Sequence, residues 1–294
     1  MERSDRKAII FGVTGQDGYY LTELCKEKGI EPIGVSRSGP YKADVADLSA
    51  VEQIVKTTKP AYIFHLAANS TTKPDVLFEN HQTIATGTLN ILHSVQKYSP
   101  AAKVFITGSG VQFKNTGQPI SESDAFEAAS PYAIARIQSV YAARYFRTQG
   151  IKGYVGYLFH HESPLRKPNH ISQMIAQAVK RIRDGSQEKI ELGAVGAEKE
   201  WTFAGDIVQG IWTLLQQEKV FEAVIGSGEA WPIQRWLEEC FRIIKKDWRS
   251  YVQVKENFVP EYKRLVSDPR QIKSLGWQPC VTLSQLAEMM VTHQ

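Results

Sequence analysis

Three glycines at intervals of three residues, Gly12, Gly15 and Gly18, mark the stretch of this sequence best suited to bind a ligand. The apolar stretch 8–11 precedes them and predicts a buried strand, and the stretch 19–26 predicts a helix. Glycine allows a close approach of the backbone to a pyrophosphate, and a helix N-terminus offers free N–H groups. The pattern therefore predicts a nucleotide site, with a glycine-rich turn in an ordinary α/β domain as the alternative.

The next expected strand, 31–36, ends in Ser36-Arg37-Ser38. In dinucleotide-binding folds the end of this strand meets the adenosine ribose, and an acidic residue there favours NAD. Arg37 suits a 2′-phosphate instead, so the sequence predicts NADP in preference to NAD, with a solvated surface arginine as the alternative. Asp44 follows, and we expect it either to meet the adenine or to cap the next helix.

A further helix is expected to begin at Ser130-Pro131-Tyr132, because proline is favoured in the first turn. Tyr132 and Arg136 are four residues apart, so they share one face of that helix. A phenol and a guanidinium on one helix face form the second group of side chains that could take part in a reaction.

Strands and helices alternate regularly through the first half of the chain. The expected strands are 8–11, 31–36, 61–68 and 103–110, and the helices between them are 19–26, 49–56 and 79–96. Such alternation is typical of right-handed βαβ units and a parallel sheet. We therefore predict an α/β fold with a dinucleotide-binding part over 1–155. Beyond the next expected strand, 154–159, the alternation weakens, so 156–294 is expected to be mainly a smaller lobe with some segments returning to the sheet.

Composition narrows the class of protein. The chain has 294 residues, a formal net charge of +4 and three separated cysteines. These features favour a protein of a reducing compartment without disulfides or a zinc site, and give no support for a nucleic-acid partner. The charged N-terminus does not fit a signal peptide, and no apolar run reaches the ~20 residues of a membrane helix. We expect a soluble cytoplasmic protein.

Several strings resemble the extended short-chain dehydrogenase/reductase family, and within it the GDP-mannose 4,6-dehydratases. They are Gly12-Val-Thr-Gly-Gln-Asp-Gly18, His65-Leu-Ala-Ala68, Ser130-Pro-Tyr-Ala133, Leu158-Phe-His-His-Glu-Ser-Pro164, Glu200-Trp201 with Asp206, and Asp268-Pro269 with Leu275-Gly-Trp277. The matches span nearly the whole chain in order. The resemblance implies a Rossmann-type doubly wound parallel sheet, a smaller C-terminal substrate-binding lobe, an NADP cofactor and a nucleotide-sugar substrate, with GDP-linked sugars as candidates.

The resemblance also implies a catalytic group. In the family a tyrosine takes the proton of a sugar hydroxyl during hydride transfer. A phenol with a pKa near ~10 is a poor base at neutral pH, so a lysine four residues later lowers the pKa of the tyrosine. Tyr132 matches the tyrosine, and Arg136 stands in the lysine position. Arginine keeps the cation but is not interchangeable with lysine. Ser109 or Thr107 is expected to supply the supporting hydroxyl, because Gly108 stands at the family's threonine.

The expected ligand contacts follow from the same matches. Cofactor contacts are expected from Gly12, Thr14, Gly15, Gln16, Asp17, Gly18, Arg37, Asp44, Val45, Leu66, Ala67, Ala68, Tyr132 and Arg136. Substrate contacts are expected from Ser109, His160, Glu162 and Lys199. We expect no metal.

Other positions depart from the family. Gly110 replaces the glutamate that removes the C5 proton in a 4,6-dehydratase, and Glu122 and Asp124 in the following loop are the only nearby candidates to replace it. Some charges of the diphosphate site are also missing, and Lys199, Arg166 and Lys167 are possible replacements. The sequence therefore predicts a dehydratase-like enzyme first, a 4-keto reductase or epimerase second, and a non-catalytic NADP-binding protein third. The family's common dimer pairs two long helices that match 79–96 and 131–147, so the resemblance implies a homodimer, with a monomer that buries these apolar helices as the alternative.

Overall fold

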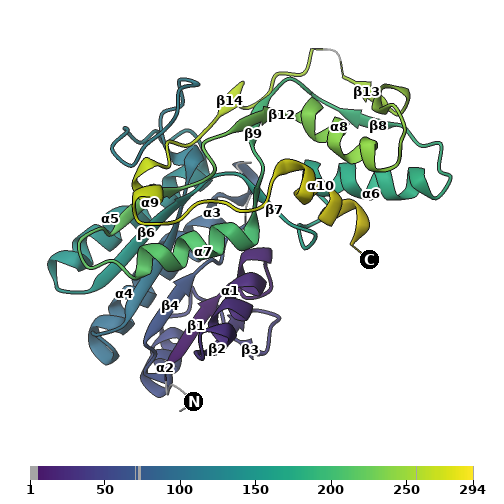
Figure 1. The fold of residues 1–294 in the computed structure, drawn as a ribbon. Helices are drawn as coiled ribbons and strands as arrows, with labels where there is room; N and C mark the ends of the chain where they lie inside the picture. The colour runs from purple at the N-terminus through teal and green to yellow at the C-terminus, as the bar shows by residue number, and fades with distance from the viewer. Residues whose placement is uncertain (1–5, 70, 72–73, 256, 294) are drawn as a thin grey trace.

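A seven-stranded parallel sheet forms the centre of the molecule (Figure 1). The structure is a computed structural model that describes residues 6–69, 71, 74–255 and 257–293. The strand order is β11-β6-β5-β4-β1-β2-β3. The strands are β1 (Lys7–Phe11), β2 (Glu31–Ser36), β3 (Tyr41–Lys42), β4 (Tyr62–His65), β5 (Lys103–Ser109), β6 (Lys152–Leu158) and β11 (Glu222–Ile225). The order reverses at β1, as in doubly wound folds, which confirms the predicted fold class.

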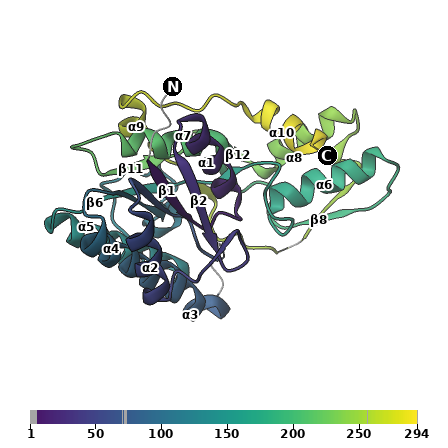
Figure 2. The same cartoon turned by 90° about the horizontal axis from the view of Figure 1, so that it is seen from below.

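Helices cover both faces of this sheet (Figure 2). One face carries α2 (Leu48–Thr58), α4 (Gly87–Tyr98) and α5 (Pro131–Thr148), and the other carries α1 (Gln16–Glu27), α7 (Ala204–Leu215) and α9 (Arg270–Ser274). The strands are apolar on both faces, as the sandwiched position requires: Ile9 packs into one core and Ile10 into the other. The carboxyl ends of the strands are left open at one edge.

A smaller lobe lies beyond that edge, on the right in Figure 1. It contains α6 (Ile171–Arg183), α8 (Ile233–Ile243) and α10 (Leu283–Thr292), with the strand pair β8 (Ile190–Leu192) and β13 (Val252–Val254) and the small sheet β12 (Ala230–Pro232), β9 (Glu198–Glu200) and β14 (Arg264–Leu265). Its own core includes Trp201 and Trp236, whose rings stack with centroids 4.8 Å apart. β7 (His161–Glu162) pairs with β10 (Thr202–Phe203) where the chain passes between the two parts.

The buried carboxylate of Glu200 ties the lobe to the sheet. Its oxygens accept hydrogen bonds from the backbone N–H of Ser267 at 2.6 Å, of Ser227 at 2.6 Å and of Gly228 at 3.3 Å. Ser227 follows β11 and Ser267 follows β14, so one side chain satisfies backbone donors at the ends of strands in both parts. The strands of the lobe are thereby held next to the open edge of the sheet.

Three local predictions differ from the structure. The expected helix 79–96 is α3 (Leu77–Asn80), a π-helical turn (His81–Thr86) and then α4. Gly87 is the residue after that turn, and it packs against Val45 and His65. A Cβ at this position would lie 2.9 Å from Val45 Cγ1. The expected strand 61–68 pairs only as far as His65, because the next residues turn to line a cavity. The two-residue edge strand β3 is too short to leave a pattern.

No helix among the described residues is both long and apolar enough to cross a membrane. The three cysteines are free, with Cys25 and Cys240 buried in the two parts and Cys280 exposed.

Candidate active site

Two adjoining cavities lie at the carboxyl ends of β1, β4 and β5. The central cavity, about 280 Å³, extends from the glycine turn past the start of α5 to the chain between β6 and α6. The flanking cavity, about 290 Å³, lies on the other side of the turn, towards the end of β2. Six residues line both of them, namely Gly12, Thr14, Gly15, Leu66, Ala68 and Lys167. The two cavities therefore meet at the glycine turn.

The turn requires its glycines for steric reasons. Gly12 has φ +90°, and a Cβ there would lie 2.7 Å from the backbone nitrogen of Ala67. A Cβ on Gly18 would lie 2.6 Å from the carbonyl oxygen of Gly12. Gly15 precedes α1 and no side chain caps that helix, so its first N–H groups face the cavities without a side-chain acceptor. This arrangement fits a pyrophosphate.

Every predicted cofactor residue lines at least one cavity. Gln16, Asp17, Gly18, Tyr132 and Arg136 line the central cavity, and Arg37, Asp44, Val45 and Ala67 line the flanking one, in addition to residues shared by both. These predictions came from positions far apart in the sequence, and the fold brings them together around one connected space.

Charged side chains face each other across the flanking cavity. Arg37 Nη2 lies 3.2 Å from Glu79 Oε1, and Asn69 donates to the other oxygen of Glu79 at 3.2 Å. Asp44 accepts from the backbone N–H of Ala46, whereas Asp47 caps α2. Of the two roles left open for Asp44, the helix cap therefore belongs to its neighbour, and Asp44 remains at the cavity wall.

Tyr132 and Arg136 lie together at the start of α5. Ser130 caps that helix by accepting from the N–H of Ala133 at 3.1 Å, with Pro131 in the first turn. The Arg136 guanidinium carbon lies 4.9 Å from the centroid of the Tyr132 ring, and Nη1 donates to the Thr107 carbonyl at 2.6 Å. Arg136 is only 2% exposed. Among the described residues no carboxylate pairs with it and its buried Nε has no acceptor, so the cation is held under the phenol without a counter-ion.

The strand end beneath them supplies one available hydroxyl. Thr107 lines the central cavity, but its hydroxyl donates to the carbonyl of His65 at 2.8 Å. Ser109 also lines it, and its oxygen accepts from the N–H of Gln112, which leaves its own proton free to donate. Of the two candidates, Ser109 is better placed to contact a ligand.

The two glycines of this strand end are enclosed by aromatic rings. A Cβ on Gly108 would lie 2.6 Å from the ring of Tyr157, and a Cβ on Gly110 would lie 2.9 Å from the ring of Phe159. Neither a threonine nor a glutamate fits at these positions in this packing, since ring atoms of buried side chains cannot simply swing away. The two departures from the family are therefore built into the surrounding core.

The loop carboxylates do not reach the site. Glu122 accepts from the N–H of Val224 at 2.9 Å, and Asp124 accepts from the N–H of Ser121 at 2.7 Å. Neither residue lines either cavity. Among the described residues, Asp17 supplies the only carboxylate in the wall of the central cavity, and it pairs with His161 at 3.0 Å.

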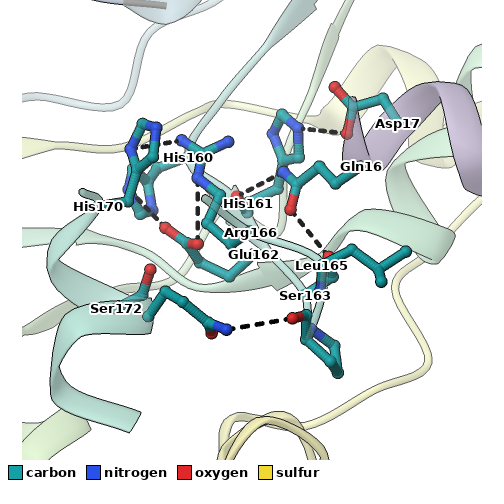
Figure 3. Close-up of polar contacts among 12 residues, drawn as sticks. Gln16, Asp17, His160, His161, Glu162, Ser163, Leu165, Arg166, His170 and Ser172 are labelled. Carbon is teal, nitrogen blue, oxygen red and sulfur yellow. Dashed lines mark hydrogen bonds and ion pairs between the residues drawn. The ribbon is translucent and has the colours of Figure 1, made fainter. Parts of the chain in front are cut away.

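A charged cluster closes the far wall of the central cavity (Figure 3). Glu162 is fully buried, with Oε1 3.0 Å from His160 Nε2 and Oε2 3.4 Å from Arg166 Nε. Lys199 Nζ lies 3.0 Å from the same His160 nitrogen. Burial alone would raise the pKa of Glu162, but the neighbouring His160 and Arg166 hold it well below its usual range. Burial lowers the pKa of Lys199 to about 8.

The cluster revises two predicted contacts. His160 lines the cavity, whereas Glu162 and Lys199 do not. Glu162 is covered by the side chains that it pairs with. It therefore orients His160 and Arg166 without lining the cavity itself. Lys199 is 7% exposed and lies over the Trp201 ring, with Nζ 4.6 Å from its centroid. Arg166 and Lys167 line the cavity on this side, and Arg136 lines it from the start of α5.

Two desolvated imidazoles, the fully buried His65 and the partly buried His160, predict that the protein loses stability in mild acid. Burial lowers the pKa of His65 and of His160 to about 4. An unfolded histidine takes up its proton near pH ~6.5, so the unfolded chain binds more protons over the interval down to about 4. The thermal midpoint should therefore fall between pH ~6.5 and ~4, and His160→Asn should flatten this dependence. Equal midpoints across that interval would contradict the assignment.

Side-chain hydrogen bonds also connect the glycine turn to residues 161–163, a contact that the sequence did not predict. The Ser163 hydroxyl donates to Gln16 Oε1 at 2.9 Å, and Gln16 Nε2 donates to the His161 carbonyl at 3.3 Å (Figure 3). Asp17 pairs with the His161 ring at 3.0 Å. The only sequence signal was that Thr-Gly-Gln-Asp-Gly and His-Glu-Ser-Pro occur in the same chain.

Comparisons with known proteins agree with this geometry. A family model described as GDP-mannose 4,6 dehydratase matches residues 37–290. GDP-mannose 4,6 dehydratase 1 of Arabidopsis thaliana is 32% identical, over 97% of this chain and 88% of its own length. The human GDP-mannose 4,6 dehydratase is 28% identical, over 97% of this chain and 90% of its own length.

Solved structures show the same fold. The structure of RMD from Pseudomonas aeruginosa complexed with NADPH has a TM-score of 0.85 at 18% identity, covering 98% of this chain and 96% of that one. UDP-glucose 4-epimerase of Thermus thermophilus, in complex with NAD, has a TM-score of 0.83 at 20% identity, covering 98% of each chain.

Proposed function

This chain belongs to the GDP-mannose 4,6-dehydratase family, and on that premise we propose that it modifies a nucleotide sugar by hydride transfer between a sugar carbon and NADP. The observation that carries the proposal is Tyr132, which faces the central cavity beside a buried cation and next to the glycine turn. Turnover of nucleotide sugars, followed through the sugar product, tests it, because a dehydratase or an epimerase returns the hydride to the sugar and leaves no net reduced cofactor.

The cavities fit the proposed cofactor. The glycine turn and the start of α1 suit its pyrophosphate, Arg37 suits its 2′-phosphate, and Leu66 to Ala68 leave room along the turn. When bound, NADP supplies a hydride acceptor, and its reduced form a hydride donor. The chain itself then has to bind the sugar, move a hydroxyl proton and keep competing water away.

Tyr132 is the proposed acid/base. Its phenolate would take the proton of the sugar hydroxyl whose carbon is oxidised, and return it in the reverse direction. Arg136 would stabilise the phenolate as a fixed positive charge, since its guanidinium lies against the ring and has no carboxylate of its own among the described residues. Ser109 would donate a hydrogen bond to the same hydroxyl and so orient it.

A 4-keto reductase or epimerase is the second candidate. A dehydratase needs a base to take the C5 proton, and the ring of Phe159 fills the space that a side chain at position 110 would need. Reduction or epimerisation needs no such base. The products separate the candidates: a 4-keto-6-deoxy sugar indicates elimination, whereas a 4-epimer or a reduced sugar indicates the alternative. Tight NADP binding without turnover of any nucleotide sugar would leave the non-catalytic candidate.

Arg37→Ala should weaken NADP binding by about tenfold and leave NAD binding almost unchanged, because a charged hydrogen bond to the 2′-phosphate is lost. Titration with both cofactors measures the two dissociation constants. Arg249→Ala is a matched control, since Arg249 is an exposed arginine that lines neither cavity. Equal losses for NADP and NAD would defeat the assignment of Arg37 to the 2′-phosphate.

We also propose that the protein is a homodimer that pairs the outer faces of α4 and α5. Large apolar side chains are exposed on these helices: Leu89 is 49% exposed, Tyr141 58% and Tyr145 62%. Light scattering should give twice the mass of one chain. Leu89→Asp with Tyr145→Asp should give a monomer, whereas Val259→Asp in the smaller lobe should not. A monomeric unaltered protein would contradict the proposal.

The substrate class proposed is a nucleotide diphosphate sugar, with GDP-linked sugars to be tested first. Arg166 gives the central cavity a positive charge of the kind that a diphosphate requires, and His160 lines the same cavity. The free cysteines are compatible with the reducing cytoplasm, which we propose as the location.

A further inference from the structure

We infer that Lys167, on the substrate side of the cleft, binds the diphosphate of the dinucleotide cofactor. The inference rests on the proposed NADP-dependent function. It assigns to the cofactor a cation that comes from the chain between β7 and α6, outside the glycine turn and the strands that surround it.

The position of Lys167 distinguishes it from the other cations. Lys167 lines the central and the flanking cavity alike, and every other residue of the flanking cavity lies between Phe11 and Thr83. The side chain therefore crosses from the substrate lobe to the place where the two cavities meet. Arg166, its neighbour, lines only the central cavity and pairs with Glu162.

The backbone around Lys167 is held in a defined place. The N–H of Arg166 donates to the Ser163 carbonyl at 3.0 Å, and the N–H of His170 donates to the Lys167 carbonyl at 3.1 Å. The hydroxyl of Ser163 accepts from the N–H of Leu165 at 3.2 Å and donates to Gln16 (Figure 3). Because Gln16 is the first residue of α1, this chain of contacts fixes Lys167 relative to the glycine turn.

The charge of the flanking cavity calls for a second cation. Its charged residues are Arg37, Lys167, Asp44 and Glu79, and Arg37 already pairs with Glu79. Without Lys167 the wall would carry two carboxylates and one paired guanidinium, which would repel a cofactor of several phosphates. The Lys167 ammonium has no carboxylate partner among the described residues, so it remains available for a phosphate.

The geometry selects the diphosphate rather than the 2′-phosphate. The residues that share both cavities with Lys167 are those of the turn, Gly12, Thr14 and Gly15, together with Leu66 and Ala68. The turn is the part of the site suited to a pyrophosphate, whereas Arg37 lies at the end of β2. A contact to the diphosphate is common to NADP and NAD, so it should not discriminate between them.

The test is a binding titration, which does not depend on turnover. Lys167→Ala should weaken NADPH and NADH binding alike, by about tenfold, and should reduce the salt dependence of both affinities. Lys167→Arg should retain most of the affinity. Lys114→Ala is the matched control, because Lys114 is an exposed lysine that lines neither cavity. An unchanged thermal midpoint of Lys167→Ala shows that folding is not the cause.

Two results would overturn the inference while the proposed function stands. Affinities of Lys167→Ala equal to those of Lys114→Ala would remove Lys167 from the cofactor site. A loss confined to NADPH would place the lysine at the 2′-phosphate. If the unaltered protein bound neither cofactor, the proposed function itself would fail, and the inference with it.

Discussion

Tyr132→Phe should lower turnover by about two to four orders of magnitude, the usual contribution of a general acid–base group. The ring of phenylalanine keeps the contact with Arg136 and the shape of the cavity, but it has no oxygen to carry the proton. Cofactor affinity should stay within about twofold of the unaltered protein, because the phosphates bind elsewhere.

The measurement is single-turnover oxidation or reduction of the cofactor, with cofactor affinity determined separately. Tyr19→Phe is the control, because Tyr19 is an exposed tyrosine on α1 and lines neither cavity. Retained turnover in Tyr132→Phe would remove Tyr132 from the mechanism, whatever the affinity for NADP.

Arg136→Met should slow turnover by about tenfold to a hundredfold. Methionine keeps much of the side-chain volume and removes the fixed positive charge under the phenol, so the phenolate loses its stabilisation. Stability should not suffer in parallel, because a buried cation without a carboxylate partner costs desolvation energy that methionine avoids.

The thermal midpoint separates this role from simple packing. A packing role would lower the thermal midpoint in parallel with turnover. Arg136→Lys, which restores the family's usual residue, should keep turnover near that of the unaltered protein. A midpoint of Arg136→Met well below that of the unaltered protein would show that Arg136 acts through structure alone.

The glycine turn of the proposed cofactor site could be predicted from the sequence because its determinants are local. The glycine spacing of the turn, the strand before it and the helix after it lie within a few residues, and the steric reasons for Gly12 and Gly18 act over the same short stretch. The alternation of strands and helices predicted the parallel sheet for the same reason, since each βαβ unit carries its own pattern.

The substrate wall was predicted less well because its contacts join distant segments. Lys199 Nζ lies 3.0 Å from His160 Nε2 although the two residues are 39 positions apart, so no local pattern indicates that they meet. The hydrogen bond between Ser163 and Gln16 joins residues that are 147 positions apart in the chain. The positions of Glu122 and Asp124 were equally undetermined, because a loop carboxylate carries no periodic signal that fixes its direction.

The aromatic rings at Gly108 and Gly110 were not predictable from the sequence. Tyr157 and Phe159 belong to β6 and the residue after it, and they meet β5 only through sheet pairing. The sequence showed that a threonine and a glutamate were absent. The structure explains why neither could return by a single substitution, since both sites are occupied by buried rings.

The account depends on hydride transfer at a sugar carbon with Tyr132 as the acid/base. Nucleotide sugars deuterated at C4 should be mixed with the NADP-loaded protein, and the reaction should be stopped within one turnover. The account predicts deuterium in the reduced cofactor, or at the sugar carbon that takes the hydride back, with the unaltered protein, and neither with Tyr132→Phe. A nucleotide sugar and NADP bound together without transfer of the label, for every sugar tested, would contradict it.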